Sequence, residues 1–143
     1  MAKCSIQMPE DFLNKLRVAV DREPEIAEKA LVAGGEIVLD KAQSNLSRAI
    51  GSGTKYPSRA TGALASSLGL SSVKVDREGN HNIKVGFEES RADGKKNAML
   101  ASVLEYGKHG QPARPFLKPA KSSSKNAAIE AMKQVFEREV GSL

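Results

Sequence analysis

The stretch "EYGKHGQPARPFLKPA", residues 105–120, determines where the chain changes direction. Its three prolines, Pro112, Pro115 and Pro119, remove backbone donors and fix φ, and the residue before each proline is pushed into an extended conformation. Helical patterns lie on both sides of the stretch. We therefore predict a stiff connection between two helices, which we call the elbow (residues 105–120).

Two side chains of the elbow have alternative roles. A backbone stiffened by proline is cheap in entropy to hold in one shape, so Arg114 and Phe116 project from a rigid support. Arg114 offers a planar fork for carboxylates or phosphates, and arginine recurs at interface hot spots. Phe116 and the adjacent Leu117 either join the same contact or pack into the core and hold the last helix. The residues alone leave both roles open.

Helical stripes precede the elbow. In "MPEDFLNKLRVAV", residues 8–20, apolar side chains recur at helical spacing. Pro24 either opens a second helix or kinks one long helix, and the helical pattern continues to about residue 50. Gly34 and Gly35 lie inside this pattern, where each costs roughly 1 kcal/mol against alanine. We expect another element of the chain to pack closely against them. The first stripe consists of Phe12, Leu13, Leu16, Ala19 and Val20.

The middle of the chain changes from a helical period to a period of two. Thr61 is a candidate cap for a short helical turn, after which apolar and polar residues alternate on both sides of "DREGNHN". This pattern predicts an antiparallel hairpin of residues 70–76 and 82–88. A short helix follows in "NAMLASVLEYG", residues 97–107, and ends at Gly107. Its side chains expected inside are Met99, Leu100, Val103 and Leu104. The final helix is expected to bury the stripe formed by Ile129, Met132, Phe136, Val140 and Leu143.

Together these patterns predict an α+β fold in one domain, residues 1–143. In this fold a small antiparallel sheet is packed by a long N-terminal helix, a short middle helix and a C-terminal helix. The length of 143 residues suits a single core, and aromatic residues make up only 4% of the chain, so aliphatic side chains must fill most of that core.

The net charge of +5 comes from residues 51–121, where twelve Lys and Arg face six Asp and Glu. A basic face indicates a nucleic acid, an acidic protein partner or a merely solvated surface. The candidate DNA-facing residues are Lys55 and Arg59, which flank Tyr56, and Lys95 with Lys96. The alternative for the loop at 51–58 is a plain connector.

No catalytic constellation is present in the sequence. His81 falls in the hairpin turn and His109 in the elbow, and neither has a neighbouring nucleophile. The lone Cys4 excludes an internal disulfide and indicates a reducing compartment. We expect no enzyme, no cofactor, no metal and no small-molecule substrate. Neither a signal peptide nor a membrane span is predicted, so we expect the protein to be cytosolic where it is made.

Four blocks of the sequence resemble a known family. They are "TGALASSL" at 61–68, "VGF" at 85–87, "LEYG" at 104–107 and "PARPFLKPA" at 112–120. In order and spacing they are similar to the head–tail joining family of long-tailed bacteriophages, the gene-product-ten-like minor tail components, also called tail-completion or neck proteins. The resemblance covers about residues 10–140. Ala65 stands where family members often carry a basic residue.

The resemblance implies an assembly role at the phage head–tail junction. Such a protein is made in the host bacterial cytoplasm and becomes part of the virion. It forms a homo-oligomeric ring, with a hexamer expected, contacts connector and tail-tube proteins, and surrounds passing DNA without reading its bases. The residues expected at a subunit or partner interface are Glu105, Tyr106, Arg114, Pro115, Phe116 and Lys118.

A small basic DNA-binding module is the alternative function. The pI near 9.4 and the "TKYPSR" loop at 54–59 support it. Against it, no helix is basic enough to serve as a recognition helix, and aromatic side chains for stacking on bases are scarce.

Overall fold

The protein is described by a computed structural model, which covers residues 3–50, 62–88 and 96–143. Long helices and two small antiparallel sheets make up this part of the chain, which confirms the α+β class. The elements in chain order are α1 (Glu10–Asp21), α2 (Glu23–Ala49), α3 (Ala63–Ser67), β1 (Leu68–Leu70), β2 (Lys74–Val75), β3 (His81–Asn82), β4 (Val85–Phe87), α4 (Asn97–Tyr106) and α5 (Leu117–Gly141).

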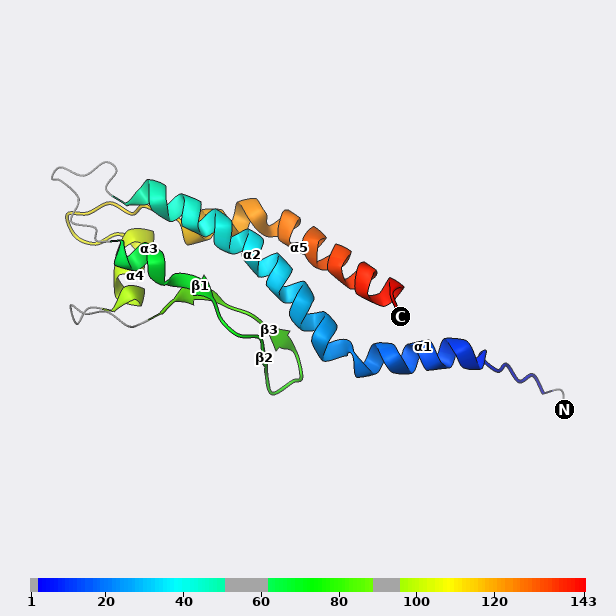
Figure 1. Ribbon diagram of the computed structural model, residues 1–143. Coiled ribbons are helices and arrows are strands. Elements are labelled where there is room, and N and C mark those ends of the chain that lie inside the picture. Colours follow the sequence, from blue (N-terminus) through cyan, green and yellow to red (C-terminus); the bar gives the residue numbers. More distant parts are fainter. Residues whose placement is uncertain (1–2, 51–61, 89–95) are drawn as a thin grey trace.

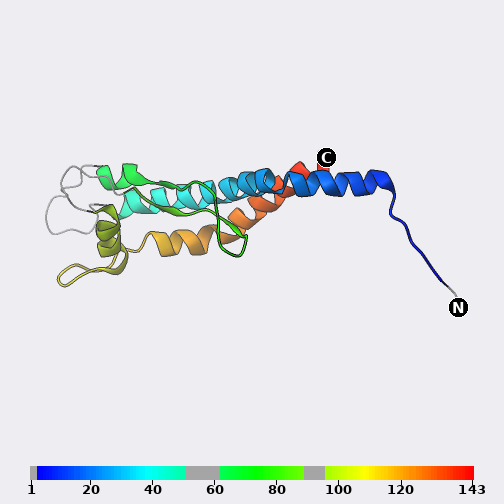
Figure 2. The same cartoon turned by 90° about the horizontal axis from the view of Figure 1, so that it is seen from below.

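Helices α2 and α5 form the body of an elongated molecule. They lie side by side, the strands follow the other side of α2, and α1 extends beyond the body at the opposite end from the elbow (Figure 1). The view from below in Figure 2 shows the same extended outline. The two helices are antiparallel, because Arg22 before α2 lies 3.0 Å from Glu139 near the end of α5. No helix in the described residues is long and apolar enough to cross a membrane.

Pro24 opens a second helix, which resolves the alternative left by the sequence. A single residue, Arg22, separates α1 from α2, and the proline occupies the first turn of α2, where no backbone donor is needed. The long N-terminal helix expected to pack on the sheet is therefore α2 alone. Helix α1 has no buried residue.

The adjacent glycines of α2 allow two elements to approach it, as predicted. A Cβ at Gly34 would lie 2.2 Å from Cε and 2.8 Å from Cγ of Met132 on α5. A Cβ at Gly35 would lie 3.0 Å from a terminal carbon of Leu70 on β1. The pair thus seats α5 on one side of α2 and the hairpin on another.

The strands form the predicted antiparallel hairpin, with an interruption. Strand β1 pairs with β4 from Leu68 opposite Phe87 to Leu70 opposite Val85, and β2 pairs with β3. Between these ladders three residues, 71–73, oppose two, 83–84, which is the arrangement of a bulge. The first paired residue is Leu68, two residues before the predicted start of the hairpin.

The buried faces of α4 and α5 differ from those expected. On α5 the buried residues are small, and Phe136 is 55% exposed although it belongs to the predicted stripe. Of the predicted stripe, Met132 does pack against α2, where Gly34 leaves room for its side chain. On α4, Met99 was expected inside but is 54% exposed. The buried residues are Ala120, Ser124 and Ala128 of α5, and Asn97, Ala101 and Glu105 of α4.

The core lies where α2, β1, α4 and the elbow meet. Phe116 is fully buried there and is the largest side chain with no exposed surface, so of the two roles left open by the sequence its side chain takes the core position. The rings of Phe116 and of Phe87 on β4 pack edge to face, with their centroids 6.0 Å apart. The buried cluster consists of Ala42, Leu46, Leu68, Ala101, Phe116 and Ala120.

Replacing Gly34 by alanine tests the close contact between α2 and α5. We expect Gly34→Ala to lower the free energy of unfolding, because the new methyl group overlaps Met132. In a Met132→Ala background the same change should instead stabilise by up to about 1 kcal/mol, since alanine favours a helix more than glycine. Urea unfolding of the four chains measures both effects. Equal effects of Gly34→Ala in both backgrounds would contradict the contact.

Removing the ring of Phe116 tests the core. We expect Phe116→Ala to cost about 3–5 kcal/mol of unfolding free energy, because a buried ring leaves a cavity. Phe136→Ala is the matched control, since that ring is 55% exposed, and its loss should cost much less. Thermal unfolding compares the two variants, and similar melting temperatures would contradict the assignment.

Candidate interaction site at the proline elbow

Within the elbow, Gly107 ends α4. Its φ of +76° lies in the left-handed region, and a Cβ there would come within 2.7 Å of the backbone nitrogen of Ala113. The N–H of Gly107 donates to the carbonyl of Val103, and the chain then reverses through a four-residue turn closed by two hydrogen bonds between Lys108 and Gln111. Glycine at 107 therefore lets the elbow fold back against its own helix.

The carboxylate of Glu105, in the last turn of α4, caps the start of α5. It accepts hydrogen bonds from the backbone N–H groups of Phe116, Leu117 and Lys118, at 2.8, 2.9 and 2.9 Å. The first N–H groups of a helix have no partner inside that helix, and α5 has no side-chain cap of its own. The side chain of Glu105 thus does for α5 what an N-cap residue does from within a helix.

The environment of Glu105 favours its charged form. Burial alone would raise the pKa of this carboxyl group, but the three backbone donors and the nearby charge of Lys118 lower the pKa below its ordinary value. The positive end of the α5 dipole acts in the same direction. Glu105 is only 7% exposed, but its buried carboxylate has hydrogen-bond donors that compensate for the loss of water.

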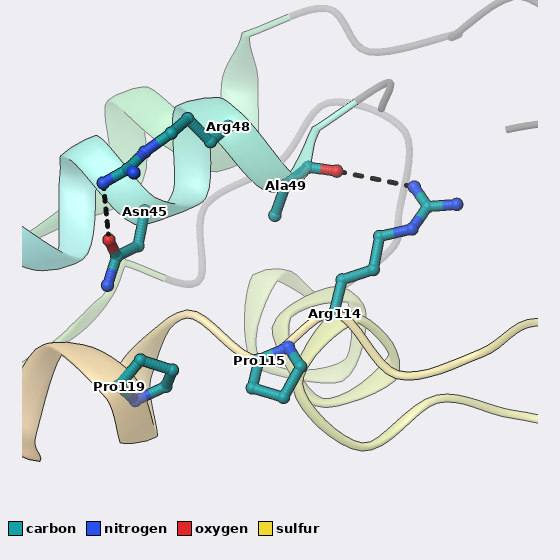
Figure 3. Close-up of a pocket in the computed structure, with 6 residues that line it drawn as sticks. All are labelled: Asn45, Arg48, Ala49, Arg114, Pro115 and Pro119. Atoms are coloured by element: carbon teal, nitrogen blue, oxygen red, sulfur yellow. Dashed lines mark hydrogen bonds between the residues drawn. The ribbon is translucent and has the colours of Figure 1, made fainter. Parts of the chain in front are cut away.

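Helix α2 and the end of α4 hold the elbow from two further sides. The side-chain amide of Asn45 donates to the carbonyl of Phe116 over 3.2 Å, and the backbone N–H of Arg114 donates to the carbonyl of Leu104. The guanidinium of Arg114 reaches the carbonyl of Ala49 at the end of α2, at 3.4 Å (Figure 3). The backbone of the elbow is therefore anchored by α2, by α4 and by the Glu105 cap.

A hollow of about 300 Å³ opens between the end of α2 and the elbow (Figure 3). Two guanidinium groups stand beside it, that of Arg114 and that of Arg48, which donates to the amide oxygen of Asn45 over 3.0 Å. No carboxylate is among the described residues that line it. Guanidinium groups suit a carboxylate or phosphate group. The lining residues are Asn45, Arg48, Ala49, Arg114, Pro115 and Pro119.

The predicted interface residues divide into two groups. Glu105 and Phe116 lie inside the protomer, where one caps α5 and the other fills the core, so the side chain of Phe116 offers no surface to a partner in this conformation. Tyr106 is 80% exposed, and Pro115 and Lys118 are also exposed. Arg114 is half-buried and borders the hollow. The interface role of the four accessible residues stays a prediction.

The predicted DNA-facing residues are mostly beyond the described part of the chain. Lys55, Arg59 and Lys95 lie outside it, as does the candidate cap Thr61. Lys96 is exposed and directly precedes α4, at the other end of that helix from Glu105.

Sequence reasoning missed the residues that support the elbow. Asn45 gave no signal, because its partner Phe116 is 71 residues away in the chain. Arg48, which donates to the side chain of Asn45, gave none either. Buried Asn97 was also missed. Its side-chain amide donates to the carbonyl of Glu88 and so joins the end of the hairpin to the start of α4. The one clue in the sequence was that Asn97, a polar residue, lies at helical spacing from Glu105.

The two histidines occupy structural or exposed positions. His81 lies 3.1 Å from Glu23, which ties the hairpin to the start of α2, and His109 is exposed in the elbow turn. Within the described residues no group of three or more His, Cys, Asp or Glu side chains could hold a metal ion.

Comparison with known proteins gives one match. Residues 10–107 match the model of the protein family described as "Bacteriophage HK97-gp10, putative tail-component". The match ends at Gly107, before the "PARPFLKPA" block that contributed most to the resemblance seen in the sequence. Neither the comparison with curated proteins nor the comparison with solved structures found a match.

Replacing Glu105 by glutamine tests the cap. We expect Glu105→Gln to lower the unfolding free energy by roughly 1–3 kcal/mol at pH 7, because charge-assisted hydrogen bonds are lost. The folded-state pKa of Glu105 is lowered, so its contribution is complete above the unfolded pKa and disappears as pH falls through the folded pKa.

The difference between wild type and Glu105→Gln should therefore shrink in acid. Urea unfolding from neutral pH to below the ordinary carboxyl pKa measures it. Glu130→Gln, an exposed change on α5, is the control and should match wild type. A difference that is independent of pH would contradict the proposed cap.

Proposed function

The chain belongs to the HK97-gp10-like family of bacteriophage tail components, which is a structural family and not an enzyme family, and we propose that it works at the head–tail junction. In this proposal identical copies form a closed ring, expected to have six members, between the connector and the tail tube, and DNA passes through its lumen. The family match and the geometry of the elbow support the proposal.

The observation that carries the proposal is the fixed presentation of Arg114. A closed ring needs contacts in which one patch meets a different patch on the neighbour. The elbow offers such a patch in one shape, since Arg114 and Arg48 stand beside Pro115 and Pro119 around the hollow. A preorganised patch loses little conformational entropy when a partner binds.

The charge of the elbow indicates an acidic partner. Its one acid, Glu105, is buried against backbone amides, whereas Lys108 and Lys118 are exposed. Carboxylates of a neighbouring subunit or of another virion protein would complement this surface. Phosphates of passing DNA would be attracted by the same charges without base recognition.

The alternative function, a small basic DNA-binding module, makes a different prediction. Such a protein would stay monomeric and bind duplex DNA with an affinity that falls steeply as salt rises. The family match favours the assembly role, because the family is one of tail components.

Replacing Arg114 by alanine in a phage that carries the gene tests the assembly role. We expect a folded protein, since the backbone N–H of Arg114 keeps its bond to Leu104, but a failure of tail joining. Electron microscopy should then show separated heads and tails. Lys121→Ala is the control, because this exposed residue lies on α5 outside the hollow, and it should give joined particles. Joined particles at wild-type yield from the Arg114 variant would count against the role of this residue.

A further inference from the structure

The first half of α5 exposes three lysines on one face. Lys118, Lys121 and Lys125 are all exposed, and they are spaced by three and four positions, so they are neighbours on the surface of the helix. We call these three residues the lysine ridge. The other exposed residues between positions 118 and 127 are proline, serine, asparagine and alanine, with no acid among them.

The second half of α5 exposes a different set of side chains. Ile129, Phe136 and Val140 are large apolar residues that reach the surface there. Acids and cations lie among them, as in "EAMKQVFERE" at 130–139. The polar, acid-free surface of the first half is therefore not a general property of this helix.

The chain around the lysine ridge contains no exposed acid. Residues 106–129 carry five Lys or Arg and no Asp or Glu. The preceding acid, Glu105, is buried, and its carboxylate accepts hydrogen bonds from the first amides of α5. Its charge attracts Lys118, whereas Lys121 and Lys125 lie about one and two turns farther along the helix. The positive potential of the ridge is therefore not cancelled within its own segment.

The composition of this face argues against a protein partner. Contact surfaces between proteins are depleted in lysine and serine and enriched in aromatic side chains, methionine and arginine. The first half of α5 exposes lysine and serine but neither an aromatic side chain nor methionine. The elbow, with Tyr106 and Arg114, has the opposite composition. The two neighbouring surfaces therefore suit different partners.

The same composition suits the phosphates of a nucleic acid. Lysine carries a compact point charge on a flexible stem, and serine hydroxyls are common partners of phosphate oxygens in complexes with DNA. Ser122 lies four residues after Lys118 and three before Lys125, so it adjoins both on the helix surface. In the free protein its hydroxyl donates to the carbonyl of Lys118, a bond that it can exchange for one to a phosphate.

The length of the ridge corresponds to a short run of phosphates. Seven residues of helix separate its two ends, which is about 10 Å. The phosphates of one strand of duplex DNA follow one another about every 3.4 Å along the axis, so the ridge covers about three of them. Contacts of this kind carry no sequence information, because they do not reach the edges of the bases.

We propose that the lysine ridge binds the phosphate backbone of duplex DNA without regard to sequence. In the ring proposed above, the ridge lines the lumen through which DNA passes. Only this placement rests on the proposed assembly role, because the phosphate contact belongs to the single chain. Three contacts per copy bind weakly and let DNA slide. The loss of one of them still leaves two per copy, so Lys121→Ala remains a suitable control for tail joining.

A nuclear magnetic resonance titration of the full chain with a short duplex of arbitrary sequence, at low salt, tests the contact. We expect the amide signals of residues 118–126 to shift. Three phosphate contacts give a slope of about −2.7 for the logarithm of affinity against that of salt, so a fourfold rise in salt should weaken binding roughly 40-fold.

Removal of the ridge charges should abolish most of this effect. A chain with Lys118→Gln, Lys121→Gln and Lys125→Gln should bind at least about tenfold more weakly at the lowest salt and lose most of the salt dependence. The matched control carries three other changes, at exposed positions at or before α1, and should keep the wild-type affinity and slope. These changes are Lys3→Gln, Lys15→Gln and Arg17→Gln, which remove the same charge.

Four outcomes would overturn the proposal. They are no binding of wild type at the lowest salt, shifts confined to residues outside 118–126, equal losses in the two variants, and shifts of the ridge with poly-glutamate but not with DNA. The last result would assign the ridge to an acidic protein. None of these measurements depends on a ring, so their failure leaves the junction role in place. Normal particles from a phage lacking the gene would refute that role instead.

Discussion

The carboxylate of Glu105, bound to three backbone amides at the start of α5, is the interaction on which the rest of the structure depends. The prolines of the elbow remove donors and stiffen the chain, but they do not fix the direction in which α5 leaves. Glu105 does so, because its hydrogen bonds join the last turn of α4 to the first turn of α5. With that joint closed, the ring of Phe116 points into the core and Arg114 stays at the surface hollow. One buried acid thus sets both the packing of the last helix and the position of the basic patch.

The helices therefore contact one another closely at the elbow end of the molecule, whereas α1 has few contacts with the rest of the chain at the other end. At the elbow, α2, α4 and α5 bind one another through backbone and side-chain hydrogen bonds. At the opposite end α1 extends with its apolar stripe exposed (Figure 1). This asymmetry suits repeated assembly of a phage tail component. The basic patch at the elbow and the exposed stripe of α1 can each contact a different surface of a neighbour. The long α2–α5 pair separates the two ends and keeps them in a constant relation.

Features with a local cause could be predicted from the sequence. The alternation around "DREGNHN" predicted the hairpin, Gly107 predicted the end of α4, and Gly34 with Gly35 predicted close packing. Features with a long-range cause could not. Glu105 was expected at a subunit or partner interface, because its role as a cap appears only when the chain reverses and brings residues 116–118 back to it. On α5 the most hydrophobic stripe was expected inside, but its members differ. Met132 packs against Gly34 of α2, whereas Phe136 is exposed and small Ala128 is buried. The basic residues Lys55, Arg59 and Lys95 lie outside the described part of the chain and stay predictions.

The most direct test of the Glu105 joint is a nuclear magnetic resonance titration that follows the Glu105 side-chain carboxyl carbon together with the amide protons of residues 116–118. We predict that the carboxyl group titrates below its ordinary range and that the three amide protons shift with the same midpoint, because the proton that neutralises the carboxylate also breaks their hydrogen bonds. An ordinary or raised pKa, or amide protons that do not respond to that titration, would contradict the account.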